Sequence, residues 1–176
     1  TFVRDGYTFD EWNTESDGTG TSYTDMQLCK SLTTGTEITL YAQWTANTYT
    51  VKFSANDSVG STSATSTMTD ETRTYDQAEQ ALKTNTMTRV GYTFGGWATN
   101  ADGSGTTYTD MALCNNLTTG TEVTLYANWI ANTYTLTLDS NGVGETTSTV
   151  ATFDSATLTS FQPSSTTNTD MKFMGY

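Results

Sequence analysis

The chain contains no histidine, one proline and two cysteines among its 176 residues. Lys and Arg number only 7 against 19 Asp and Glu, which gives a net charge of −12. A surface this acidic repels nucleic-acid phosphates and offers no basic patch for anionic lipid. The sequence also shows no apolar run long enough for a transmembrane helix and no secretory signal peptide. We therefore expect no nucleic-acid partner and no membrane insertion by this segment.

The lack of histidine also limits the acid–base catalysis that the chain could perform. The scattered carboxylates have no His or cationic partner to tune them for acid–base work, so we predict no enzymatic activity, no catalytic residues and no cofactor. Two pairs, Asp17/Asp25 and Asp102/Asp110, with Glu15 or its counterpart Asn100, resemble a sparse calcium loop. They lack the run of oxygen ligands that an EF-hand needs, so we predict hairpin-turn roles and no metal site.

What the sequence does contain is an internal repeat. Residues 91–129 repeat residues 6–44 at an offset of 85 (91 minus 6), with 27 of the 39 positions identical. Such a period marks a tandem array. Within each copy, large apolar residues alternate with Thr, Tyr and Asn, most clearly over 121–129. This alternation is typical of strands with one buried face.

Both copies carry Gly-Tyr-Thr-Phe-x-x-Trp, then Asp-Gly-x-Gly-Thr-x-Tyr, then Leu-Tyr-Ala-x-Trp. This pattern resembles the Listeria–Bacteroides repeat, also called the internalin B-repeat. The resemblance implies small β-grasp-like modules strung in tandem on large bacterial surface proteins. It implies no shared catalytic residues.

Between the two copies, residues 76–83 show the signals of a helix. Asp76 can act as N-cap with Glu79 completing a capping box, and Ala78, Ala81 and Leu82 form an apolar stripe. The order strand–strand–helix–strand–strand then favours an α+β, strand-rich fold. We predict tandem β-grasp-like repeats, each with a mixed sheet and one short helix.

The repeat also predicts the domain organisation. Residues 1–46 correspond to the C-terminal half of a repeat, 47–131 to a complete central repeat and 132–176 to the N-terminal half of the next. The joint Asn-Thr-Tyr-Thr at 47–50 recurs at 132–135, too short for a flexible linker, which indicates a semi-rigid rod. The two halves belong either to a longer array or to molecules that complete one another head to tail.

The four tryptophans occupy the same two positions of each copy, which favours core packing over sugar stacking. We predict that Trp97, Phe94, Leu125 and Trp129 are largely buried around the helix carrying Leu82. An extended array advances about 30 Å per repeat, so Cys29 and Cys114 should not bond to each other. Each is expected to be a small buried hydrophobe, with lateral pairing to another chain as the alternative.

These observations predict a non-enzymatic extracellular structural repeat that forms a semi-rigid stalk or filament segment of a cell-surface protein. The alternative is an adhesin-type binding module that engages a surface glycan or protein. The expected partners are neighbouring repeats or copies of the chain itself. A stalk tolerates differences between copies at outward positions, whereas a binding module predicts an exposed apolar patch that recurs in both copies.

Overall fold

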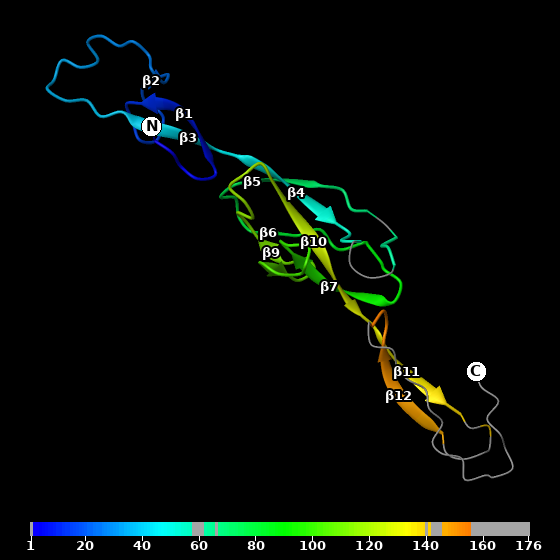
Figure 1. Ribbon diagram of the computed structural model, residues 1–176. Helices are drawn as coiled ribbons and strands as arrows, with labels where there is room; N and C mark the ends of the chain where they lie inside the picture. Colours follow the sequence, from blue (N-terminus) through cyan, green and yellow to red (C-terminus); the bar gives the residue numbers. More distant parts are fainter. Residues whose placement is uncertain (1, 58–61, 66, 140, 142–145, 156–176) are drawn as a thin grey trace.

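The computed structural model describes residues 2–57, 62–65, 67–139, 141 and 146–155, and its regular structure is entirely β-strand. Three bodies of sheet follow one another along a line, from β1–β3 through a large central sheet to the β11–β12 hairpin (Figure 1). The described ranges contain no helix, and so none long and apolar enough to cross a membrane. The molecule is therefore elongated, with each body of sheet touching the next.

The central sheet has five strands in the order β5-β4-β10-β7-β8. Strand β10 lies in the middle, parallel to β4 and antiparallel to β7, and a separate two-stranded ladder joins β6 to β9. The strands of this region are β4 (Thr48–Ser54), β5 (Glu71–Thr74), β6 (Gln80–Ala81), β7 (Tyr92–Ala98), β8 (Thr107–Tyr108), β9 (Leu113–Cys114) and β10 (Glu122–Ala131).

The flanking bodies repeat parts of this sheet in the same register. The N-terminal sheet, β2-β1-β3, matches β8-β7-β10: Trp12 lies opposite Tyr23 as Trp97 lies opposite Tyr108. The C-terminal hairpin matches β4 and β5, with Tyr134 opposite Ala151. These strands are β1 (Tyr7–Asn13), β2 (Ser22–Tyr23), β3 (Tyr41–Ala46), β11 (Thr133–Leu138) and β12 (Thr147–Thr152).

The core lies on one face of the central sheet. Trp97 and Leu125 are fully buried, as predicted, and Leu82 is 2% exposed. Phe94 and Trp129 are partly buried and pack against this cluster. The Trp97 ring stands 5.0 Å from Phe53 and 4.9 Å from Phe94, centroid to centroid, in the tilted and edge-on arrangements that aromatic rings prefer. The core prediction is confirmed for Trp97 and Leu125.

The predicted helix at 76–83 is wrong, and with it the α+β class and the β-grasp assignment built on that helix. Asp76 has φ = 56°, a left-handed conformation that an N-cap residue does not adopt. Gln80 and Ala81 instead form β6 and pair with β9. An eight-residue helix is marginal by itself, and residues 80–82 instead pair with β9 and the residue before it. Of the expected apolar stripe only Leu82 is buried, since Ala78 and Ala81 are exposed.

A single residue separates successive bodies of sheet, Asn47 between β3 and β4 and Asn132 between β10 and β11. The five strands of the central sheet come from residues 48–131, and the domain limits at 47 and 131 stay a prediction. Residues 156–176 of the predicted third unit lie outside the described residues.

Candidate functional site

Two of the four carboxylates considered for calcium, Asp17 and Asp102, bond within their own turns, whereas Asp25 and Asp110 accept hydrogen bonds from other parts of the chain. Asp17 accepts hydrogen bonds from the backbone N–H and hydroxyl of Thr19 at 3.0 and 2.7 Å, and Asp102 does the same with Ser104 at 2.9 and 2.6 Å. These bonds, with the hydroxyl bond first, lower the pKa of both carboxyls. Among the described residues, no three His, Cys, Asp or Glu side chains gather as a metal site would require.

The feature that recurs with a defined geometry is the joint between successive bodies of sheet. At the first joint, the Tyr7 hydroxyl donates to Asp76 Oδ2 at 2.6 Å, and the Tyr7 ring meets the Tyr75 ring edge-on at 5.8 Å. Asn47 lies between them: its N–H donates to the Gly6 carbonyl and its carbonyl accepts from the Tyr75 N–H, both at 2.9 Å. One asparagine thus ties the end of one sheet to the start of the next.

The second joint is built in the same way. The Tyr92 hydroxyl donates to Asp154 Oδ2 at 2.7 Å, and its ring stands edge-on to Phe153 at 5.5 Å. The Asn132 N–H donates to the Gly91 carbonyl at 2.9 Å, and its carbonyl accepts from the Phe153 N–H at 2.8 Å. These four contacts of the first joint therefore each have a counterpart in the second.

Each joint contains one glycine and one aspartate in the left-handed conformation. Gly6 and Gly91 have φ of 77° and 81°, and a Cβ on either would collide with the ring of Tyr75 or Phe153. Asp76 and Asp154 both have φ = 56°, a conformation that Asp tolerates better than most residues. An arginine stacks on the ring of each tyrosine, Arg4 over Tyr7 at 3.7 Å and Arg89 over Tyr92 at 4.5 Å.

Hydrogen bonding shifts the pKa values at the first joint. The bond from Tyr7, and then the bond from the Asn116 amide, lower the pKa of Asp76 below its ordinary value of 3.8. The same bond to Asp76 raises the pKa of Tyr7 above 10.0, and the bond to Asp154 raises that of Tyr92. The joint is thus held by a charged carboxylate and a neutral phenol.

The joints should weaken at both extremes of pH. Because the pKa of Asp76 is lowered in the folded protein, its contribution to the stability of the joint is present above pH 3.8 and is lost as the pH falls through the folded pKa. Because the pKa of Tyr7 is raised, its contribution is present below pH 10.0 and is lost as the pH rises through the folded pKa. We expect segmental motion, followed by energy transfer between dyes on the N-terminal and central sheets, to increase below about pH 4 and above about pH 10. The Tyr7→Phe variant should already move more at neutral pH and should lose both transitions, unlike the Tyr41→Phe control.

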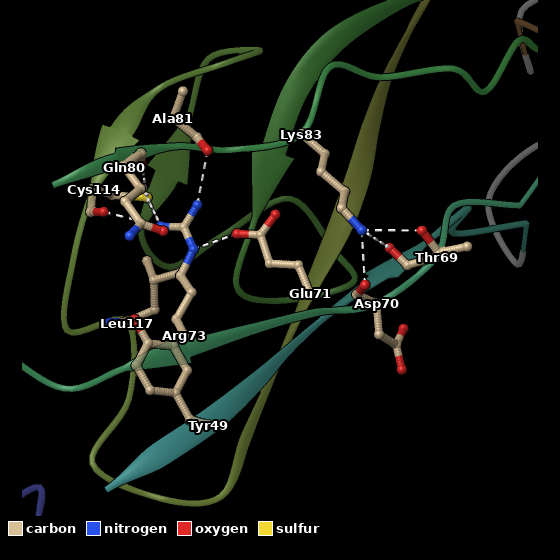
Figure 2. Close-up of polar contacts among 10 residues, drawn as sticks. All are labelled: Tyr49, Thr69, Asp70, Glu71, Arg73, Gln80, Ala81, Lys83, Cys114 and Leu117. Atoms are coloured by element: carbon tan, nitrogen blue, oxygen red, sulfur yellow. Dashed lines mark hydrogen bonds and ion pairs between the residues drawn. The ribbon is translucent and has the colours of Figure 1, made fainter. Parts of the chain in front are cut away.

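Inside the central unit, an unpredicted polar network surrounds Arg73, which is 5% exposed (Figure 2). Its guanidinium donates to the carbonyls of Cys114 and Ala81, both at 2.9 Å, to Cys114 Sγ at 3.3 Å and to the Glu71 carboxylate. Burial acts to lower the pKa of Arg73, but Glu71 outweighs it and keeps the pKa above its ordinary value. The network fastens β5 to the β6–β9 ladder.

The two cysteines occupy different environments, and both are free. Cys114 is buried, as predicted, because β6 and Arg73 cover it. The same prediction is wrong for Cys29, which is exposed. No described strand pairs with residues 28–29 in the way that β6 pairs with β9. All four tryptophans are buried or partly buried, which agrees with packing rather than sugar stacking.

Sequence reasoning missed Asp76, Asn116 and Arg73. Asp76 was assigned to a helix cap, although its match with Asp154 and the recurrence of Asn47 as Asn132 were visible signals of a repeated joint. Arg73 carried no such signal, since the equivalent position of the third unit is Ala151.

Comparison with known proteins agrees with the repeated architecture. The family described as "Listeria-Bacteroides repeat domain" matches residues 1–43 and 49–128. A protein of Evansella cellulosilytica named "Putative Gly-rich membrane protein" is 40% identical over 142 residues, which are 79% of this chain and 16% of that protein. Another protein of that organism, named "Putative membrane protein", is 38% identical over 96 residues, 54% of this chain and 13% of the relative. No solved structure is a significant match. The chain thus spans only a small part of these relatives.

Proposed function

Because the chain belongs to the Listeria-Bacteroides repeat family, we propose that it is a non-enzymatic structural segment of an extracellular cell-surface protein. In this role it acts as a semi-rigid stalk or filament segment. The observation that carries the proposal is the joint, which is built twice with the same hydrogen bonds and ring contact. A one-residue connection held from both sides fixes the direction of each unit relative to the last.

The charge and shape of the chain support the same function. The three bodies of sheet lie in a line rather than folding back on one another (Figure 1). A net charge of −12 favours solubility and opposes collapse of a long exposed polymer. The relatives are far longer than this chain, and both are named as membrane proteins. Protease treatment of intact cells that produce the native protein should release fragments of this segment, whereas protection from protease would contradict an extracellular location.

The Gly91→Ala variant tests whether the joint is rigid. Its Cβ would stand 2.3 Å from the Phe153 ring at a backbone with φ = 81°. Such strain costs about 1–3 kcal/mol, so amide hydrogen exchange in β11 and β12 should accelerate about tenfold or more. Gly120→Ala is the matched control, because the atom nearest to its added Cβ would be the Thr118 hydroxyl at 3.4 Å and its φ is not left-handed. Equal exchange in the two variants would contradict a stiff joint.

Adhesion is the second candidate function, and one observation favours it. Met26 and Leu28 are 92% and 99% exposed, and their counterparts Met111 and Leu113 are 55% and 66% exposed. An apolar pair that recurs at the surface of both copies is what a binding module would present. If adhesion is the function, the Leu28→Lys/Leu113→Lys variant should lose attachment to host or neighbouring-cell surfaces and keep the wild-type scattering profile.

A further inference from the structure

The edge of β3 is open where the equivalent edge of β10 is covered. Strand β10 pairs with β7 on one side and with β4, in parallel, on the other. Strand β3 pairs with β1, the counterpart of β7, and is the last strand of its sheet in the described part of the chain. The open edge therefore corresponds to the position that β4 fills in the central sheet.

The segment before β3 shows the effect of the open edge. In the central unit β10 begins at Glu122, and residues 122–126 are the ones that pair with β4. The equivalent residues 37–40 form no strand, and β3 begins only at Tyr41. Leu125 is fully buried, whereas its counterpart Leu40 is only partly buried. Since both sequences alternate apolar and polar residues in the same way, the difference comes from the neighbouring strand.

At the other end of the molecule, the β11–β12 hairpin is the counterpart of the strands that cover this edge in the central sheet. Strands β11 and β12 form the same hairpin as β4 and β5, with Tyr134 opposite Ala151 as Tyr49 is opposite Arg73. The apolar face of β4 is buried, with Tyr49 at 2% and Val51 at 0% exposure. Tyr134, the counterpart of Tyr49, is 52% exposed. Among the residues that the structure describes, β11 and β12 form a two-stranded sheet, so the hairpin carries the apolar face of β4 without further strands beside it.

We propose that the β11–β12 hairpin of one molecule docks on the open β3 edge of a second copy, with β11 parallel to residues 37–41. The central sheet sets the register: Val51 lies opposite Val123 and Phe53 opposite Leu125. The counterparts of the β4 residues lie 85 positions later, in β11, and the counterparts of the β10 residues lie 85 positions earlier. This register therefore puts Leu136 opposite Ile38 and Leu138 opposite Leu40. The interface is already established inside this chain between β4 and β10, and the proposal repeats it between molecules.

Docking in this way is heterologous and generates an open head-to-tail chain rather than a closed dimer. It covers the Leu136 and Leu138 side chains, which are only partly buried in the free hairpin, and gives residues 37–40 a strand to pair with, which removes an exposed sheet edge. A repeat preceding this segment in a longer protein would supply the same hairpin within one molecule. The proposal does not rest on the cell-surface function, since it concerns only the surfaces of the chain itself.

Light scattering over a hundredfold range of concentration tests the association. The mean mass of the chain should rise with concentration, and the Leu136→Arg variant should associate at least tenfold more weakly. Thr137→Lys is the matched control on the opposite face, where the central hairpin carries Lys52, and it should associate like the wild type. A monomer at every concentration, or equal association of Leu136→Arg and wild type, would overturn the proposal.

Crosslinking tests the register without requiring that the variants associate strongly. In a background with Cys29→Ser and Cys114→Ser, a mixture of Ile38→Cys and Leu136→Cys chains should form intermolecular disulfides on oxidation. Neighbouring strands are about 4.8 Å apart, within disulfide range. A mixture of Ile38→Cys and Thr137→Cys chains, whose side chains face opposite sides, should not crosslink. Equal crosslinking of the two mixtures would overturn the register.

A final variant identifies the source of the docked hairpin. A chain with an extra copy of residues 47–85 placed before Thr1 carries the hairpin for its own β3 edge. This chain should stay monomeric, and residues 37–40 should gain protection from amide exchange. Persistent association of the lengthened chain would show that its oligomers form through another surface and would contradict strand docking.

Discussion

Replacing Trp97 with alanine will lower the free energy of unfolding of the central unit by about 3–5 kcal/mol, the usual cost of removing a large core aromatic. The side chain is fully buried and contacts the Phe53 and Phe94 rings. A loss of this size is a large part of the stability of a small domain. Denaturant unfolding of the whole chain, followed by amide exchange in β7 and β10, measures the loss.

Trp12→Ala is the control, since Trp12 occupies the same position of the first copy and is only partly buried. It should cost less than half as much, and it should leave exchange in the central sheet unchanged. The Trp97→Phe change should also cost less than alanine, because it keeps most of the ring volume and removes an Nε1–H that has no hydrogen-bond partner among the described residues. A Trp97→Ala variant within about 1 kcal/mol of the wild type would contradict the assigned core.

Replacing Arg73 with alanine should cost about 3–5 kcal/mol, as expected when one partner of a buried ion pair is removed. The change leaves the carbonyls of Cys114 and Ala81 without their donor and the Glu71 carboxylate, whose side chain is 14% exposed, without its partner. Arg73→Lys should fall between wild type and alanine, since an ammonium cannot reproduce the planar fork of donors. The readout is the denaturant midpoint of the central unit.

Lys52→Ala is the matched control for the arginine. Lys52 also pairs with a glutamate, Glu122, at 2.6 Å, but their side chains are 41% and 56% exposed. An exposed pair contributes about 0–1 kcal/mol. If Lys52→Ala and Arg73→Ala destabilise the chain equally, the buried network is not what fastens β5 to the β6–β9 ladder.

The strands could be predicted because their signal is local. The alternation of apolar and polar residues over 121–129 specifies a strand with one buried face, whatever its neighbours. The 85-residue period then predicts the same strand in the other copy. The register of β1 with β3 matches that of β7 with β10, including the position of the irregularity. The burial of Trp97 and Leu125 followed from the same pattern.

The segment 76–83 could not be predicted in this way, because its local signals point to a helix and its contacts do not. Asp76 forms the joint with Tyr7 and Asn116, residues that lie 69 and 40 positions away in the chain. Ala81 pairs with Leu113 and accepts a hydrogen bond from Arg73. Capping and stripe signals contribute little in a helix so short, so these distant partners decide the outcome.

The sequence by itself determined the repeat, the long strands and the apolar face of each unit, since these depend on spacing along the chain. Only the tertiary structure decided the environment of residues that are identical in the two copies. Cys29 is exposed and Cys114 is buried, although their neighbours in sequence are nearly the same. The difference lies in whether β6 pairs alongside. Burial is a property of the assembled sheet, and the pairing of a strand depends on which other strand lies beside it.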